Sequence, residues 1–195
     1  MDPLGGTTKG ADGITRCWWC GDDPLYVDYH DRDWGTPIHD ERSLFELLCL
    51  EGFQAGLSWI TILRKREAFR AAFQGFDPDI VAAYTEGDVD RLLADVGIVR
   101  HRGKITATIG NAKAVLAMGE EGTSLEQVVW SHAPAPRKRP LRARSEIPAE
   151  TAESAALAKA LRKRGMRFVG ATTVYAFMQS AGLVDDHLAG CHRAV

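Results

Sequence analysis

Apolar residues recur at intervals of three or four along most of the chain, the spacing that places them on one face of an α-helix. Residues 40–76 carry Leu44, Leu48 and Ile60 in this pattern, with a break near residues 52–56 that holds two glycines, so we predict two helices there. No run alternates apolar and polar residues with a period of two, so the sequence pattern does not indicate a β-sheet. We therefore predict an all-α protein, with further helices over residues 79–84, 86–97, 104–122, 124–132, 151–165 and 172–184.

Two segments fall outside this helical pattern. Residues 1–14 are rich in glycine and polar residues, so we expect them to be a disordered tail ahead of a single domain over residues 15–195. Residues 133–148 hold four of the eight prolines and five basic residues, which is typical of a solvated loop.

The composition is that of an ordinary globular protein. The chain has 195 residues, is 45% hydrophobic and carries a net charge of −2, so it is neither disordered nor marked by a global basic field. No apolar stretch approaches the ~18 residues of a membrane span, and the first 14 residues do not read as a signal peptide. We expect a cytoplasmic protein, a monomer, with no membrane partner.

Cysteines and histidines gather near the two ends of the chain. In a reducing cytosol, thiols close to histidines are more plausibly metal ligands than disulfides, and Zn²⁺ takes thiolate and imidazole ligands in a tetrahedron. Four protein ligands would clip the termini together and leave no position for a catalytic water. The spacing leaves more candidates than a tetrahedron needs: Cys17, Cys20, His30, His187, Cys191 and His192.

Aromatic side chains are concentrated in the first third of the chain, which holds four of the five tryptophans. They could be core residues, or they could line a pocket for a flat ligand such as a nucleobase. Glu51 favours the pocket, because it lies between apolar helical stretches, followed by Gly52 and Gly56, where it could accept hydrogen bonds from a base edge and attract positive charge.

A glycine-bracketed turn at residues 96–104 separates two predicted helices. Backbone N–H groups at the second helix start, with Arg102 and Lys104 nearby, could hold a DNA phosphate. An ordinary αα-hairpin with solvated basic residues is the alternative.

Taken together, these segments resemble the 3-methyladenine DNA glycosylase I family of the helix-hairpin-helix superfamily. The blocks that carry the resemblance cover residues 23–35, 48–63, 97–105, 145–148 and 168–187. The resemblance implies a helix-hairpin-helix unit around residues 86–118 and a zinc lobe built from residues 15–35 and 183–195.

The resemblance also implies roles for individual residues. It implies one structural zinc that is held by four ligands. It implies that Glu51 is the catalytic residue and selects the base together with an aromatic pocket. It also implies that a wedge segment, residues 54–57, and the hairpin contact DNA. Phe53 stands where the family commonly has a polar residue, and we expect it to change how the wedge meets the opposite strand. We expect the basic loop 137–144 to add phosphate contacts. The implied sets are Cys17, His30, His187 and Cys191 for zinc; Tyr29, Trp59, Trp19 and Trp34 for the base; and Gln54, Gly56, Leu57, Gly97, Arg102, Gly103 and Lys104 for DNA.

The implied activity is monofunctional excision of 3-methyladenine from alkylated double-stranded DNA, with the free base as product and an abasic site left behind. The chain has no Asp between Asp95 and Asp185, and an adenine methylated at N3 already carries positive charge, so it leaves with little need for a strong acid. Three alternatives stay open: a zinc-stabilised DNA-binding module, a glycosylase for another alkylpurine such as 3-methylguanine, and a zinc hydrolase or deaminase, which a closed tetrahedron disfavours.

Overall fold

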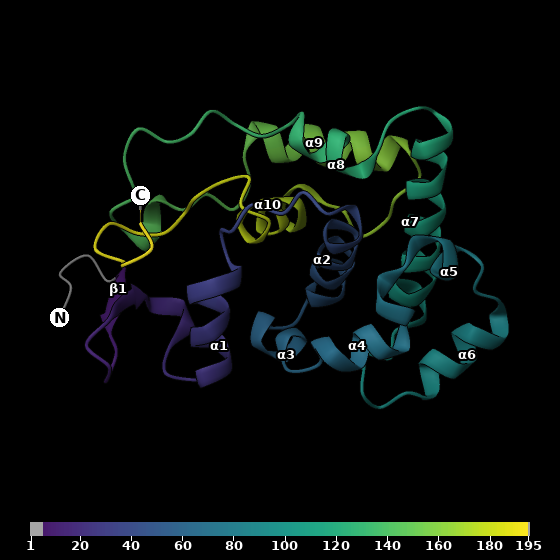
Figure 1. Ribbon diagram of the computed structural model, residues 1–195, viewed down its shortest axis with the longest axis horizontal. Helices are drawn as coiled ribbons and strands as arrows, with labels where there is room; N and C mark the ends of the chain where they lie inside the picture. The colour runs from purple at the N-terminus through teal and green to yellow at the C-terminus, as the bar shows by residue number, and fades with distance from the viewer. Residues whose placement is uncertain (1–5, 195) are drawn as a thin grey trace.

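A computed structural model describes residues 6–194, and within them the chain is predominantly helical, as the sequence predicts (Figure 1). Several of its long helices start where the sequence supplies a side-chain cap. Asp40 accepts the Ser43 N–H at 2.8 Å, and Thr151 with Ser154 forms a capping box. The helices are α1 (Pro24–Asp28), α2 (Glu41–Gln54), α3 (Trp59–Leu63), α4 (Arg66–Ala72), α5 (Pro78–Ala82), α6 (Glu86–Ala94), α7 (Arg102–Glu120), α8 (Leu125–Trp130), α9 (Ala152–Lys163) and α10 (Ala171–Ser180).

Helix α2 lies at the centre of the molecule, with α10 beside it and α5, α6 and α7 at one end (Figure 1). Eight of its residues are buried, from Leu44 to Phe53, so α2 is covered on most of its sides. The predicted break after α2 is confirmed. The second predicted helix is divided into α3 and α4, with a 3-10 turn η3 (Gln74–Phe76) after α4.

The prediction of a disordered tail over residues 1–14 is wrong for the part that the structure describes. Strand β1 (Thr7–Lys9) pairs antiparallel with β2 (Thr15–Cys17), with Thr8 opposite Arg16, and so forms a small sheet that the sequence pattern did not indicate. The Arg16 guanidinium is bonded to Asp12 and Asp31 at 2.7–3.0 Å, which fixes this ribbon to the segment that follows. Residues 1–5 lie outside the described residues.

The two ends of the chain lie together on the same side of the molecule (Figure 1). The His192 N–H donates to the Thr15 carbonyl at 2.9 Å, and Leu188 forms an isolated bridge with Leu141. A second apolar cluster joins these ends to the segment after β2, which contains the short turn η1 (Trp18–Cys20), α1 and the π-helical turn η2 (Tyr29–Asp33). The larger core lies between α2, α7, α9 and α10.

The loop 133–148 is only partly solvated. Its Arg137 guanidinium bonds the buried Asp186 carboxylate at 2.8 and 3.1 Å, and the Arg144 guanidinium lies 5.2 Å from the Trp18 ring. The expected phosphate contact at Arg137 therefore has to be revised, because that cation is already held by a carboxylate inside the protein. No helix within residues 6–194 combines the length and apolar character needed to cross a membrane.

Candidate functional site

The aromatic residues near the N-terminus pack against one another as a group. The Trp19 ring lies 4.9 Å from Trp34 and 5.0 Å from Tyr26, and Tyr29 lies 5.5 Å from Trp59. These side chains come from η1, α1, η2 with the residue that follows it, and α3. These short elements therefore bring together the aromatic residues that are concentrated in the first third of the chain.

The rings border a pocket of about 290 Å³ between the N-terminal segment, α2 and α10. This volume lies at the lower end of the range for sites that bind small molecules. Such sites combine apolar walls with a few polar groups in defined positions. Its lining residues are Trp18, Trp19, Tyr26, Tyr29, Trp34, Glu51, Gln54, Trp59, Ile147, Ala176, Gln179 and Ser180.

Glu51 lies in the wall of this pocket and is 2% exposed. Its Oε1 accepts a hydrogen bond of 3.0 Å from Ser180, whereas its Oε2 and the Trp59 indole N–H are buried without a hydrogen-bond partner within the described chain. Burial raises the pKa of Glu51 to about 8, and the Ser180 hydrogen bond opposes that rise. A buried acceptor and a buried donor without partners on one pocket indicate a ligand that supplies both.

Tyr29 is another polar side chain of the pocket. Its hydroxyl donates to Ser180 at 3.0 Å, and burial, followed by the nearby Glu51 carboxyl, raises the pKa of Tyr29 well above its usual value. Glu51, Tyr29, Trp59, Trp19 and Trp34, the base-site residues expected from the sequence, therefore line the same cavity.

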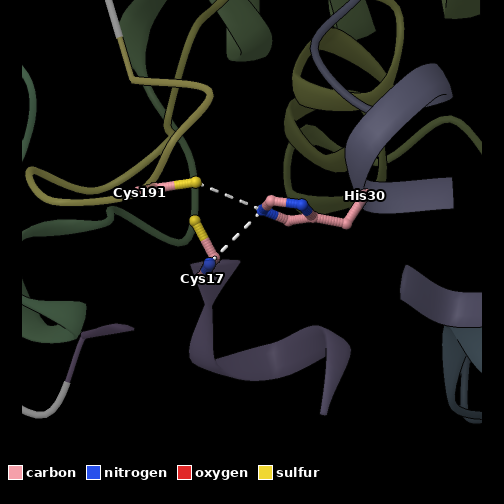
Figure 2. Close-up of side chains that lie close together, drawn as sticks. All are labelled: Cys17, His30 and Cys191. Carbon is pink, nitrogen blue, oxygen red and sulfur yellow. Dashed lines mark hydrogen bonds between the residues drawn. The ribbon is translucent and has the colours of Figure 1, made fainter. Parts of the chain in front are cut away.

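Three of the four expected zinc ligands lie close together (Figure 2). One ligand atom from each of Cys17, His30 and Cys191 lies within 4.8 Å of the others, and all three side chains are buried. The His30 Nδ1 bonds Asp31 at 2.8 Å, so the tautomer with Nδ1–H leaves the Nε2 lone pair directed toward Cys191 Sγ at 3.4 Å and the Cys17 backbone N–H at 3.3 Å. The hydrogen bond between the two thiols lowers the pKa of Cys191 and raises that of Cys17, so Cys191 is the thiol of the pair that loses its proton first.

His187, the fourth expected ligand, stands beside this group but outside the 4.8 Å set. Its ring lies 5.2 Å from His30, its Nδ1 bonds Asp185 at 2.8 Å, and its buried Nε2 has no hydrogen-bond partner among the described residues. The ring packs over Gly35, where an added Cβ would meet it at 2.8 Å. A fixed imidazole with an unpaired nitrogen beside two thiols and a second imidazole has the chemistry of a metal ligand.

The surplus cysteine and histidine candidates have other positions. Cys20 donates its thiol hydrogen bond to the Cys17 carbonyl at 3.2 Å, and Cys49 is buried in the larger core. His192 is exposed and forms a second group with His30 and Asp31. The geometry therefore favours Cys17 over Cys20 beside His30.

Residues 54–57, which the sequence predicts to be the wedge, run from the last residue of α2 into the turn before α3. Gln54 reaches the pocket, Gly56 has a φ of +86°, and the Leu57 side chain is 43% exposed. Phe53 does not belong to this surface, because it is buried and its ring lies 4.6 Å from Phe69. Its expected effect on the opposite DNA strand is therefore wrong.

Lys104 occupies a place that the sequence did not predict. Its side chain is buried, and its ammonium donates to the carbonyl oxygens of Phe53 at 2.8 Å and Ala55 at 2.7 Å, at the C-terminal end of α2. Such a cation stabilises the unsatisfied carbonyls of a helix end. The expected phosphate contact of this ammonium has to be corrected to a contact that supports residues 54–57.

The other hairpin residues lie at the surface between α6 and α7. Arg102 is half-exposed and forms ion pairs with Glu86 and Asp90 at 2.9 and 2.6 Å. Gly97 donates its N–H to Asp95, and an added Cβ there would meet Asp95 and Ala68 at about 3 Å, so a larger residue would disturb the turn. Gly103 packs against the His101 ring, which caps α7.

Sequence reasoning missed several residues of the site, above all Ser180 and Gln179 on α10 and the carboxylates Asp31 and Asp185 that orient the two imidazoles. The carboxylates had a local signal, since each lies within two positions of its histidine in the chain. Ser180 had none, because its partners lie 129 and 151 residues away.

Comparison with known proteins agrees with this geometry. Residues 19–194 match the family model for methyladenine glycosylase. DNA-3-methyladenine glycosylase 1 of Escherichia coli strain K12 is 55% identical over 179 residues, which cover 91% of this chain and 96% of that protein. DNA-3-methyladenine glycosylase of Haemophilus influenzae is 51% identical over 181 residues, with the same coverage of both chains.

Solved structures are similar in fold as well as in sequence. A crystal structure of 3-methyladenine DNA glycosylase I is 55% identical, with a TM-score of 0.88 over 91% of this chain and 98% of that one. A variant of 3-methyladenine DNA glycosylase I in complex with 3-methyladenine is 38% identical, with a TM-score of 0.86 over 91% of this chain and 96% of that one.

Proposed function

The chain belongs to the methyladenine glycosylase family, and on that basis we propose that it is a monofunctional DNA glycosylase that excises 3-methyladenine in base excision repair. The observation that carries the proposal is Glu51, a buried carboxyl group with an unpaired Oε2 in an aromatic pocket.

The pocket has the chemistry needed to select this lesion. Adenine methylated at N3 within DNA is a cation, and its positive charge favours the ionised form of Glu51 although burial raises the pKa of that group. The resulting carboxylate, together with electron-rich ring faces, attracts this cation more than neutral adenine. The base stacks on Trp59, and its amino group donates to Glu51. Trp19 and Trp34 complete the apolar wall, which excludes water and strengthens these contacts.

The target base has to leave the duplex stack before it can enter such a pocket. Residues 54–57 carry the exposed Leu57 next to the pocket, and we infer that this side chain fills the gap left by the flipped nucleotide. The turn at Gly97 and Gly103 between α6 and α7 serves as the hairpin of a helix-hairpin-helix unit, whose backbone N–H groups hold DNA phosphates.

The reaction itself asks little of the protein. Because the methylated base already carries positive charge, the C1′–N9 bond breaks with the electron pair leaving on the base. Water then adds at C1′ and loses its proton to solvent. None of the residues that line the pocket within the described chain is a lysine, which fits hydrolysis to an abasic site without a covalent amine adduct or strand cleavage.

The donor set at the chain termini fits a zinc ion. Cys17, His30, His187 and Cys191 would hold it with two sulfur and two nitrogen ligands, and with no position left for water. When bound, the zinc supplies cross-linking of the N- and C-terminal segments rather than catalysis. Those segments carry Trp19 and Tyr29, so the zinc stabilises one wall of the pocket.

The alternatives differ in what they leave unexplained. A DNA-binding module without catalysis has no use for a buried Glu51 without a partner, and a zinc hydrolase or deaminase requires an open metal position. A glycosylase for another alkylpurine keeps the same pocket, and the hydrogen-bonding groups of that pocket are the feature that would distinguish the bases.

The test is release of the free base from methylated duplex DNA. We expect the wild type and the Glu120→Gln variant, which changes an exposed carboxylate at the end of α7, to release 3-methyladenine at equal rates. We expect Glu51→Gln to release it at least 100-fold more slowly. Equal rates for all three proteins would remove Glu51 from the site, and binding to DNA without base release would favour the DNA-binding module.

A further inference from the structure

The guanidinium of Arg144 lies at the edge of the aromatic pocket. Arg144 begins the 3-10 turn η4 (Arg144–Glu146), and its Cζ lies 5.2 Å from the centre of the Trp18 ring. Trp18 and Ile147, the residue after η4, both line the pocket, whereas Arg144 does not. The cation therefore lies outside the cavity, against one of its walls.

Arg144 is an exposed cation without an anionic partner. Among the described residues its guanidinium forms no ion pair with a carboxylate, whereas Arg137 in the same loop is held by Asp186. The carboxylate of Glu146, two positions along the chain, accepts the backbone N–H of Arg142 at 2.9 Å. The Arg144 guanidinium therefore keeps its N–H donors available for an anion from outside the protein.

The turn that carries Arg144 is fixed on both sides. Before the turn, the Ala189 N–H donates to the Leu141 carbonyl at 2.7 Å, and Leu141 packs against the second apolar cluster. After the turn, Ile147 packs against the same cluster. The Trp18 ring adds a cation–π contact, which limits the orientations of the Arg144 side chain. A guanidinium held in this way loses less conformational entropy when it binds an anion.

We propose that Arg144 binds a backbone phosphate beside the flipped nucleotide and so holds the DNA strand at the edge of the aromatic pocket. The inference rests on the proposed function, since it requires this cavity to receive a base. A base inside the cavity leaves its sugar and the flanking phosphates at the edge, where the Arg144 cation lies. The planar guanidinium matches two phosphate oxygens, and a protein with a net charge of −2 needs local cations to hold a polyanion.

The charges favour a contact with phosphate rather than with the base. The methylated base of the proposed substrate is itself a cation, so the Arg144 cation repels it. The flanking phosphates are the nearest anions of that substrate. The contact therefore adds affinity for DNA of any sequence, while selection of the base stays with the residues that line the pocket.

The experiment measures the Kd of two duplexes, one with an abasic-site analogue and one undamaged, at several salt concentrations. We expect Arg144→Met, which keeps an apolar cover on Trp18 but removes the charge, to weaken binding to the abasic-site duplex about 10-fold at low salt. The slope of log Kd against log salt concentration should fall by about 0.9, the value for one lost phosphate contact. The undamaged duplex should be affected less, because it places no nucleotide at the edge of the pocket.

Two further variants separate a specific contact from general attraction. Arg144→Lys keeps the charge but not the planar fork, so it should keep the salt slope and lose part of the affinity. Arg139→Met is the matched control, since it removes another exposed arginine of the same loop. We expect this control to change the Kd of the abasic-site duplex by less than about 2-fold, because an exposed charge away from the bound strand is screened by salt.

The Kd of free 3-methyladenine, measured by tryptophan fluorescence, should be unchanged in Arg144→Met, and a circular dichroism spectrum checks the fold of this variant. The proposal is overturned if Arg144→Met leaves the salt slope unchanged, if it weakens both duplexes or the free base equally, or if Arg139→Met has the same effect. A wild type that neither prefers the abasic-site duplex nor releases 3-methyladenine would instead refute the proposed function.

Discussion

Replacing Glu51 by glutamine should stabilise the protein at neutral and alkaline pH while it disables the site. Burial raises the pKa of this carboxyl to about 8, against 4.5 for an unperturbed glutamate. Between these two values the folded protein keeps a proton that the unfolded chain releases. The folded state is therefore most favoured below about pH 4.5 and loses stability as the pH rises toward 8.

The magnitude follows from the size of this shift. One pKa unit corresponds to about 1.4 kcal/mol, so the Glu51 contribution should fall by about 3 kcal/mol between pH 5 and pH 8. A glutamine of the same shape cannot ionise and lacks this dependence. The difference between the two proteins should therefore grow by that amount over this pH range, in favour of the variant.

Urea unfolding at several pH values, with the zinc concentration held constant, measures this difference. Other titrating groups, including those of the terminal metal cluster, are present in both proteins and cancel in the comparison. Two stability curves that run parallel from pH 5 to pH 8 would refute the reasoning, because they would mean that Glu51 ionises in the folded protein as it does in water.

Three further predictions concern the surroundings of the pocket. Purified wild-type protein should contain about one zinc per chain by elemental analysis, and Cys191→Ser should lose most of this zinc and melt several degrees lower. Wild-type protein without zinc would contradict the proposed zinc site at the chain termini. Lys104→Met should cost about 1–3 kcal/mol in urea unfolding and speed amide hydrogen exchange in residues 53–57, because two carbonyls lose a charged donor; unchanged exchange there would exclude this support role. Leu57→Ser should weaken binding to a duplex with an abasic site at least 10-fold and leave the Kd of free 3-methyladenine unchanged; equal loss of both would show a general disturbance of the pocket.

The long helices were predictable because their signals are local. The apolar spacing of α2 and α7, the cap at Asp40 and the glycine that follows α7 all lie within a few residues of the feature that they determine. Helix α1 also had a local signal that sequence reasoning did not use, since Asp23 caps it and Pro24 occupies its first turn. The β1 strand had no such signal, because three residues form a strand only once β2 lies beside them.

The residues of the candidate site also divide into those with a local signal in the sequence and those without one. Glu51 was predictable because a carboxyl group in an apolar helical run needs an explanation, and its burial is confirmed. The ammonium of Lys104 was assigned to DNA because the sequence places it at a helix start. Its actual partners, the carbonyls of residues 53 and 55, are 51 and 49 positions away. Ser180 could not be found from pattern at all, since a serine at a helix end is ordinary until its two partners are known.

The most direct test of the account is a crystal structure of the protein soaked with free 3-methyladenine. We expect the base to stack on Trp59 in the aromatic pocket, with its amino group within hydrogen-bond distance of Glu51 Oε2. A base bound elsewhere, or bound in this pocket with its amino group away from Glu51 and Tyr29, would contradict the claim that these acceptors select the damaged purine.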